Sequence, residues 1–163
     1  MPKSNGTIDR IDLSILRELQ EDGRITIVEL SKRVGLSKTP CLERVRRLES
    51  RGYIGGYRAL LEPVRLGAGH VTFVQVTLGN TTTEALVAFH RAAERVTEIQ
   101  GCYMIAGGFD YLLKVRTRDI QAYRRLLGER IASLPNVVQT STFVVMETIK
   151  DESTVPVPDS LGD

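Results

Sequence analysis

Residues 26–51 read TIVELSKRVGLSKTPCLERVRRLESR and contain two helical patterns separated by a short turn. Thr26 is a predicted N-cap for the first helix, and Glu29, three residues later, completes a capping box. The turn begins at Gly35, a residue type that commonly ends helices. An amphipathic helix that ends before Gly23 precedes this pair. Two helices joined by a short turn with a glycine are the signature of a helix-turn-helix, so the segment predicts DNA binding.

The second helix of this pair carries the predicted DNA contacts. Ser37 or Thr39 caps this helix. Its buried stripe consists of Leu42, Val45 and Leu48. The opposite surface is polar and basic, which suits base edges and phosphates in a major groove. The predicted DNA-binding residues are Ser37, Lys38, Thr39, Pro40, Glu43, Arg44, Arg46 and Arg47. The alternative is a surface helix whose charges are only solvated, and the preceding helix and turn favour DNA binding over it.

Positive charge is concentrated in the first part of the chain, whose 163 residues have a formal net charge of +2. Residues 1–60 contain 12 Lys and Arg against 8 Asp and Glu, a net +4, whereas residues 61–163 contain 10 against 12, a net −2. The first part is therefore expected to bind a polyanion such as double-stranded DNA. The sequence has no apolar run that could span a bilayer and no signal-like stretch, so we expect a cytoplasmic, nucleoid-associated protein without a membrane partner.

The second half of the chain alternates strand and helix patterns. Runs of β-branched residues bounded by turn residues predict strands, and apolar residues at helical spacing predict helices. The predicted elements are a strand over 71–78, a helix over 82–96, strands over 98–106 and 110–117, a helix that begins after Asp119, and a strand over 137–149. The order βαββαβ is that of the ferredoxin-like fold.

These patterns predict two domains and a tail. Residues 8–69 form the predicted helix-turn-helix domain with its hinge, in which residues 53–61 have the pattern of a β-strand. Residues 70–150 form the predicted ferredoxin-like domain, and residues 151–163 form a predicted mobile tail. The fold class is therefore α+β, with a β-strand hinge between a helix-turn-helix domain and a βαββαβ domain.

The sequence contains no constellation of catalytic or metal-binding residues. His70 and His90 lie apart, and the common nucleophile, phosphate-binding and dinucleotide-binding motifs do not occur. Cys41 and Cys102 are the two cysteines, and neither has a metal-ligand spacing, so both are expected to be reduced. We therefore expect no enzymatic activity, no metal and no cofactor.

Residues 106–111, AGGFDY, are the most distinctive segment of the second half and allow two interpretations. In the first, Gly107 and Gly108 supply the positive φ angles of a tight hairpin turn. In the second, backbone N–H groups of the turn hold a carboxylate, and Asp110 accepts an ammonium group. An α-amino acid carries both of these charges. The residues by themselves leave both interpretations open.

Several motifs together resemble the Lrp/AsnC family of transcription regulators. They are the segment DRID at residues 9–12, the helix-turn-helix pattern up to Glu49, and the segments GGFDYLLK at 107–114 and YRRLLG at 123–128. The resemblance covers about residues 8–150 and is especially close to the leucine-responsive branch, including the triplet Thr39-Pro40-Cys41.

This resemblance implies a homodimer that assembles further, commonly into an octameric ring that wraps DNA. It also implies that residues 70–150 bind an amino-acid effector between dimers, and that the effector modulates sequence-specific control of amino-acid metabolism genes. The effector contacts that it transfers to this chain are Met104, Gly107, Asp110, Thr140 and Thr142. Close relatives often carry an acidic residue where this chain has Gly108, so the resemblance does not assign leucine as the effector.

Two other functions remain compatible with the sequence. The chain could be mainly architectural, wrapping DNA with loose sequence preference and without a true effector. It could instead be an amino-acid-binding regulatory module of an enzyme, because βαββαβ domains of this kind also regulate metabolic enzymes. The helix-turn-helix pattern over residues 24–51 argues against the second of these functions.

Overall fold

The computed structural model describes residues 8–160 and divides them into two compact units. The first unit contains residues 8–60 together with residues 151–160, and the second contains residues 61–150. The division after Leu60 falls inside the segment that the sequence predicts as a hinge. No helix in the described part of the chain combines the length and apolar character that a membrane span needs.

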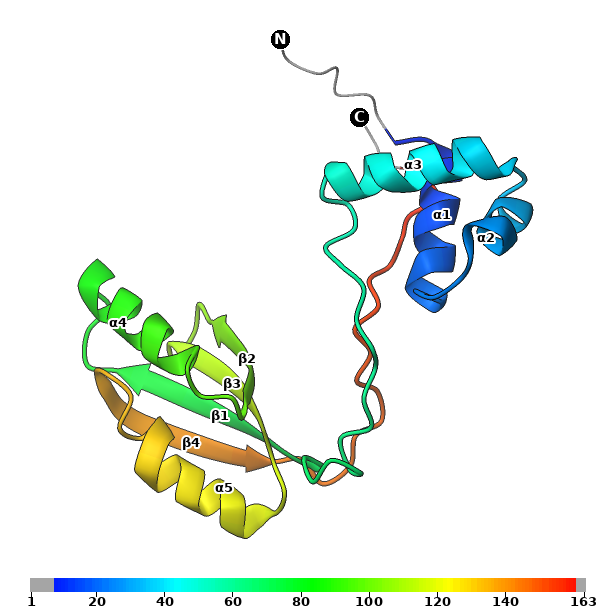
Figure 1. Ribbon diagram of the computed structural model, residues 1–163. Coiled ribbons are helices and arrows are strands. Elements are labelled where there is room, and N and C mark those ends of the chain that lie inside the picture. Colours follow the sequence, from blue (N-terminus) through cyan, green and yellow to red (C-terminus); the bar gives the residue numbers. More distant parts are fainter. Residues whose placement is uncertain (1–7, 161–163) are drawn as a thin grey trace. The chain divides into compact units, whose positions relative to one another are not determined.

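The first unit is built from three helices (Figure 1). They are α1 (Arg10–Glu21), α2 (Ile27–Arg33) and α3 (Lys38–Ser50). Each helix contributes apolar residues at helical spacing to one small core, whose buried members are Ile8, Leu13, Ile15, Leu30, Cys41, Val45 and Leu48. The helix-turn-helix predicted from the sequence is confirmed, because α2 and α3 follow each other across a turn at Gly35 with a φ of +70°.

The capping box of this unit lies on a different helix from the one predicted. At α1, the Asp9 side chain accepts the N–H of Asp12, and the Asp12 side chain accepts the N–H of Asp9 in return. At α2, the Thr26 hydroxyl accepts the N–H of Glu29 at 3.2 Å, as predicted. The Glu29 carboxylate, however, contacts Arg33 of the same helix, with 3.4 Å between Oε1 and Nε. Only half of the predicted box therefore forms at α2.

The second unit has the predicted βαββαβ order. Its elements are β1 (His70–Leu78), α4 (Thr83–Ala93), β2 (Ile99–Met104), β3 (Tyr111–Thr117), α5 (Ile120–Leu126) with a π-helical continuation (Leu127–Ile131), and β4 (Val137–Val144). The strands form one antiparallel sheet in the order β2-β3-β1-β4. The α+β class and the ferredoxin-like topology are confirmed.

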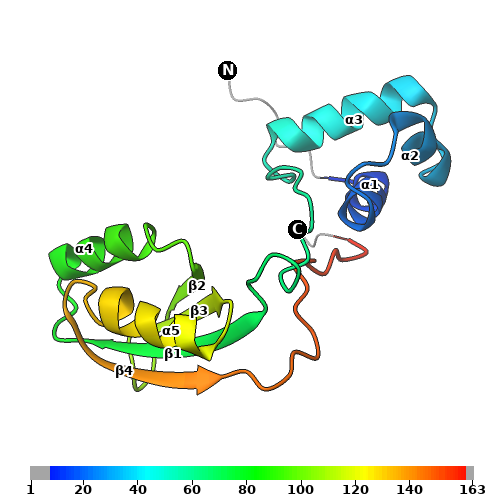
Figure 2. The same cartoon turned by 60° about the horizontal axis from the view of Figure 1, so that its bottom comes forward.

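The two helices of this unit cover one face of the sheet (Figure 2). Strand residues that alternate along β1 and β3, such as Val74 and Leu113, are fully buried against α4 and α5. The opposite face carries Phe73, Phe143 and Leu112, and Phe143 of this set is 51% exposed. Phe73 and Phe143 lie directly opposite each other on neighbouring strands and form an apolar pair on this face, next to Lys114 of β3.

Two predicted strand segments do not form. Residues 54–69 contain no strand, so the β-strand hinge predicted over 53–61 is wrong for the described chain. A strand needs a neighbour for its backbone groups, and the single chain offers none to this segment. The last strand ends at Val144 instead of residue 149, because its pairing partner in the register is Thr72, close to the start of β1.

The C-terminal segment also differs from its prediction as a mobile tail. Residues 151–160 belong to the first unit, where Arg17 and Gln20 of α1 form hydrogen bonds with them. Val157 packs against the core of that unit. The apolar side chain of Val157 explains part of this placement, whereas Val155 stays 64% exposed and is held through its backbone groups. Residues 161–163 of the predicted tail lie outside the described residues.

Candidate DNA-binding and effector sites

The exposed surface of α3 holds one part of the predicted DNA-binding residues. Lys38, Thr39, Glu43 and Arg46 are all exposed, and within residues 8–160 neither Lys38 nor Arg46 forms an ion pair. Ser37 is the N-cap of α3, although its side chain forms no capping hydrogen bond. A lysine in the first turn opposes the helix dipole, which favours negative charge at that end. Lys38 therefore does not serve the stability of the helix.

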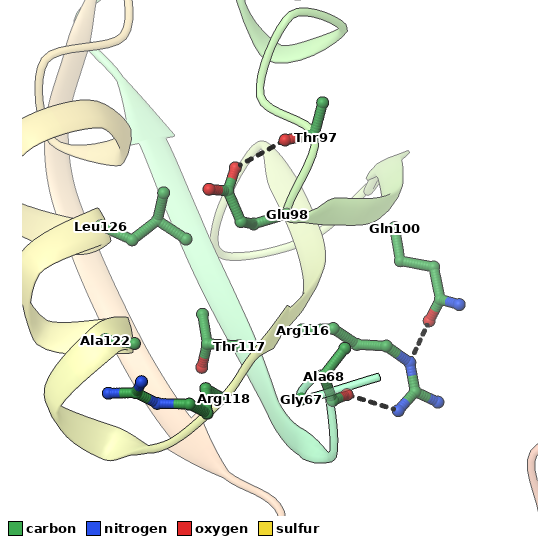
Figure 3. A pocket seen from close by; sticks show the side chains of 10 residues that line it. All are labelled: Gly67, Ala68, Thr97, Glu98, Gln100, Arg116, Thr117, Arg118, Ala122 and Leu126. Atoms are coloured by element: carbon green, nitrogen blue, oxygen red, sulfur yellow. Dashed lines mark hydrogen bonds between the residues drawn. The ribbon is translucent and has the colours of Figure 1, made fainter. Parts of the chain in front are cut away.

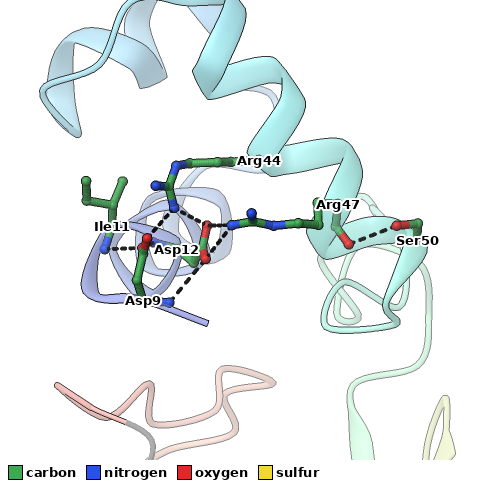
Figure 4. A network of polar contacts seen from close by, with 6 residues as sticks. All are labelled: Asp9, Ile11, Asp12, Arg44, Arg47 and Ser50. Carbon is green, nitrogen blue, oxygen red and sulfur yellow. Dashed lines mark hydrogen bonds and ion pairs between the residues drawn. The ribbon is translucent and has the colours of Figure 1, made fainter. Parts of the chain in front are cut away.

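Arg44 and Arg47 behave differently from these residues, because acidic side chains of α1 bind both (Figure 4). Arg44 Nη1 lies 2.6 Å from Asp9 Oδ2 and 2.9 Å from Asp12 Oδ1. Arg47 Nη2 lies 2.8 Å from the other carboxylate oxygen of Asp12. The Asp12 side chain is only 1% exposed, so this carboxylate is buried between two guanidinium groups. The network fixes α3 to α1.

The pKa shifts of Asp9 and Arg44 agree with this geometry. Burial acts to raise the pKa of Asp9, but the Asp12 N–H and the Arg44 guanidinium outweigh it and lower that pKa below its ordinary value. The carboxylates of Asp9 and Asp12 in turn raise the pKa of Arg44. Both shifts favour the charged forms of Asp9 and Arg44, as expected for an ion pair.

The role of Asp9 and Asp12 as partners of α3 is not evident from the sequence. Asp12 appears in the sequence only as an acidic residue in the first turn of a helix, where it suits the helix dipole. Its partners Arg44 and Arg47 lie 32 and 35 residues later. Two sequence features together could have indicated this contact. They are an aspartate on the buried face of α1 and arginines at the edge of the buried face of another helix in the same unit.

The turn at residues 106–110 anchors the end of the sheet. The predicted hairpin forms, because β2 and β3 are antiparallel neighbours joined by this segment. Neither Gly107 nor Gly108 has a positive φ angle, so the tight two-glycine turn within that prediction is wrong. Asp110 instead bonds to β1: its N–H donates to Val76 O at 3.0 Å, and its Oδ2 accepts the N–H of Leu78 at 2.7 Å. One oxygen of the Asp110 carboxylate thus has a structural hydrogen bond.

The other predicted effector residues lie at different places in the sheet, and not all of them are close to this turn. Met104 is 60% exposed and ends β2, where it pairs with Tyr111 directly after Asp110. Thr140 is the register partner of Val76, the residue whose carbonyl accepts the Asp110 N–H. Thr142 lies two residues further along β4, and its hydroxyl is 2.5 Å from the Tyr123 hydroxyl of α5. The structure groups Met104, Gly107 and Asp110 at one end of the sheet and separates Thr142 from them.

A cavity of about 400 Å³ lies between α4 and the edge strand β2, beside the turn. Met104 and Tyr111 line it, together with His90, a residue that no sequence motif connects with a site. His90 Nε2 lies 2.6 Å from the Tyr111 hydroxyl. Burial, followed by the nearby Cys102 and Asp110, raises the pKa of Tyr111, which keeps its hydroxyl neutral. The cavity therefore combines apolar walls with the hydrogen-bonded His90–Tyr111 pair and the polar side chains of Glu94 and Gln100.

A second cavity of about 470 Å³ lies at the opposite end of β3 (Figure 3). Its polar side chains bond within the unit: Arg116 Nε donates to Gln100 Oε1 at 2.9 Å, and Thr97 Oγ1 donates to Glu98 Oε2 at 3.1 Å. None of the predicted effector residues lines this cavity. Among the described residues, no group of three His, Cys, Asp or Glu side chains could hold a metal ion.

Comparisons with known proteins agree with this division into two units. The winged helix-turn-helix DNA-binding family matches residues 8–54, and the Lrp/AsnC ligand binding domain family matches residues 71–155. A DNA-binding unit joined to a ligand-binding unit defines the class of ligand-responsive transcription regulators. The chain belongs to the Lrp/AsnC family, whose DNA-binding and ligand-binding domains it carries in that order.

Relatives of the chain are similar over nearly their whole length. The proline dehydrogenase transcriptional activator of Rhizobium radiobacter is 56% identical over 144 residues, which are 88% of this chain and 92% of that protein. The leucine-responsive regulatory protein of Escherichia coli strain K12 is 55% identical over 146 residues, 90% of this chain and 89% of that protein. A Neisseria meningitidis transcriptional regulator solved with L-Met has a TM-score of 0.87 and 34% identity, covering 92% of this chain and 97% of that chain.

Proposed function

We propose that the exposed side of α3 contacts DNA and that an amino acid bound near residues 104–110 changes the affinity of that contact. The observation that carries the DNA part is the pair of basic side chains, Lys38 and Arg46, which project from α3 without an ion-pair partner in the described chain. The regulated genes are those of amino-acid degradation. The relative that is named as an activator of proline dehydrogenase supports this target class.

The proposed effector site uses the end of the sheet at Met104, Gly107 and Asp110. The second carboxylate oxygen of Asp110 accepts the ammonium group of the ligand, since only Oδ2 bonds to Leu78. The side chain of the ligand packs on Met104, which is exposed and lines the neighbouring cavity. Thr140 completes the site across β1, whereas Thr142 acts through its contact with Tyr123. Solved relatives in complex with L-methionine support an amino acid as the ligand.

Replacing Asp110 by asparagine tests this site. The asparagine side chain retains an oxygen for the Leu78 N–H but loses the negative charge, so the fold persists while the ammonium contact weakens. We expect the affinity for the amino acid to fall about tenfold or more, since hydrogen bonds to charged groups contribute about 1.5–3 kcal/mol. Titration calorimetry with L-proline, L-leucine and L-methionine measures the affinity for each amino acid. Fluorescence anisotropy with a DNA duplex measures how each amino acid changes the affinity for DNA.

The matched control for Asp110→Asn is Glu129→Gln, which removes one negative charge from an exposed position of the same unit. Equal ligand affinity for Asp110→Asn and wild type contradicts the ammonium contact. If none of the three amino acids binds the wild-type chain or shifts its DNA affinity, the proposed effector role in this form is wrong.

We also propose that the open face of the sheet is the surface through which the chain forms a homodimer and larger rings, up to an octamer. Phe73, Leu112 and Phe143 place apolar area on a sheet face that α4 and α5 do not cover. Phe143 is half exposed on the edge strand β4 beside Phe73, and exposed aromatic residues commonly anchor interfaces. The protein acts on DNA in the cytoplasm and, as a regulator, catalyses no reaction.

Phe143→Lys tests the assembly surface. A lysine beside Phe73 places a charge inside the apolar contact, so we expect self-association to weaken by about 100-fold, the effect of losing an anchor worth roughly 2–3 kcal/mol. Sedimentation velocity over a range of protein concentrations measures this change. Gln121→Lys, which adds the same charge to the exposed surface of α5, serves as the control. An unchanged mass distribution for Phe143→Lys excludes the open face as the interface.

A further inference from the structure

The C-terminal segment is bound to α1 of the DNA-binding unit by paired hydrogen bonds. Gln20 Nε2 donates to Val155 O at 2.9 Å, and Val155 N donates to Gln20 Oε1 at the same distance. One side chain thus satisfies both backbone groups of Val155, as a neighbouring strand would. In Figure 1 this segment, coloured red, runs beside α1.

Arg17, one helical turn before Gln20, binds the following residues of the same segment. Its Nη2 donates to Pro158 O at 2.7 Å and to Val157 O at 3.3 Å. The same nitrogen lies 2.8 Å from Asp159 Oδ1. These contacts and those of Gln20 span five consecutive residues, so the segment follows α1 in one defined register.

Apolar contacts and two prolines support this binding. Val157 packs against the core of the unit, and Val155 and Val157 line a small cavity with Leu16 and Leu19 of α1. Pro156 and Pro158 flank Val157. Proline limits the conformations of the unbound segment, which lowers the entropy that is lost on binding.

The segment also cancels the positive charge of the unit to which it binds. Residues 8–60 contain eleven Lys and Arg against eight Asp and Glu, a formal net charge of +3. Residues 151–160 contain no Lys or Arg and three acidic residues, Asp151, Glu152 and Asp159. The described first unit therefore has eleven charges of each sign and a formal net charge of zero.

We propose that residues 151–160 act as an internal acidic ligand of the helix-turn-helix unit and lower its affinity for DNA. Affinity for DNA without a preferred sequence depends mainly on the positive charge that the protein presents to the phosphates. The segment belongs to the DNA-binding unit and brings it three negative charges, of which Asp159 is paired with Arg17 of α1. This inference rests on the proposed DNA-binding function, and it adds that the C-terminal segment sets the strength of that function.

The test is the triple variant Asp151→Asn, Glu152→Gln and Asp159→Asn of the full chain, which keeps Val155, Val157 and both prolines. The matched control, Glu84→Gln, Glu94→Gln and Glu129→Gln, removes three exposed negative charges from the other unit. Fluorescence anisotropy with a random-sequence duplex measures the affinity of each protein. At about 50 mM KCl we expect the tail variant to bind about threefold to tenfold more tightly than wild type and the control to change less than twofold, with smaller gains at about 200 mM.

The outcomes separate this inference from the proposed function. If wild type and both variants fail to bind any duplex at low salt, DNA binding itself is wrong. If wild type binds and the tail variant gains no more than the control, the internal ligand is wrong and only overall charge matters. A chain that stops after Lys150 is a second variant, and it should match or exceed the gain of the triple variant when its circular dichroism shows folded helices.

Hydrogen exchange tests the binding of the segment independently of DNA. The Val155 amide, which donates to Gln20, should exchange about tenfold more slowly in wild type than in Gln20→Ala, because its protecting acceptor is removed. If the Val155 amide of the wild-type chain exchanges as fast as that of an unstructured peptide, the segment does not bind α1.

Discussion

We expect Asp12→Ala to lower the free energy of unfolding of the DNA-binding unit by about 2–3 kcal/mol. The substitution removes a buried carboxylate that binds Arg44, Arg47 and the backbone N–H of Asp9. This loss of stability is smaller than the roughly 3–5 kcal/mol that breaking a fully buried ion pair costs, because both arginines are partly exposed and water can solvate them. Urea unfolding followed by circular dichroism measures it.

DNA binding should weaken together with stability in this variant. Without Asp12, Arg47 loses its carboxylate partner and Arg44 keeps only Asp9, so the ionic attachment of α3 to α1 is weakened. We expect DNA affinity to fall about fivefold to tenfold at a temperature where the unit is still folded. The control is Glu21→Gln on the same helix, which is exposed and should change stability by less than about 0.5 kcal/mol. Equal stability of Asp12→Ala and Glu21→Gln contradicts the structural role of Asp12.

The double variant Lys38→Ala and Arg46→Ala should lose about 100-fold in DNA affinity with no change in stability. Each side chain is exposed on α3, and a contact to a phosphate or base edge is worth about 1–3 kcal/mol. The slope of log affinity against log salt concentration should fall by about two, one for each lost charge. Anisotropy titrations at several salt concentrations measure both quantities.

A charge-matched control distinguishes contact from overall charge in this experiment. Arg91→Ala with Arg125→Ala removes two exposed arginines from the ligand-binding unit. This control should retain DNA affinity within about threefold, because distant charges are screened by salt. If both double variants lose the same affinity, α3 is not the DNA-contacting helix.

Local patterns explain what could be predicted from the sequence. The three helices of the first unit were predictable because their caps and apolar spacing involve residues within a few positions of one another, as with Thr26 and Glu29. The βαββαβ order was likewise predictable from alternating patterns in the second half. The family resemblance added the expectation of an effector site, although the residue-level assignment of that site stays a prediction.

Long-range contacts explain what could not be predicted. The pairing of Asp12 with Arg47, and that of Gln20 with Val155, joins residues 35 and 135 positions apart. The structural bond of Asp110 to Leu78 likewise crosses from a turn to another strand. The strand predicted near residue 57 failed for the opposite reason, since its local pattern was favourable but no neighbouring strand exists in the described chain to pair with it.

The attachment of α3 to α1 has a consequence for protein engineering. Transplanting the recognition helix alone into another helix-turn-helix scaffold would carry over Arg44 and Arg47 but leave behind the carboxylates of Asp9 and Asp12 that orient them. A chimaera that exchanges operator preference should therefore transfer residues 9–12 and 37–51 as one module. Comparing the operator affinity of this chimaera with that of a graft of residues 37–51 alone measures how much of the DNA specificity depends on residues that do not contact DNA.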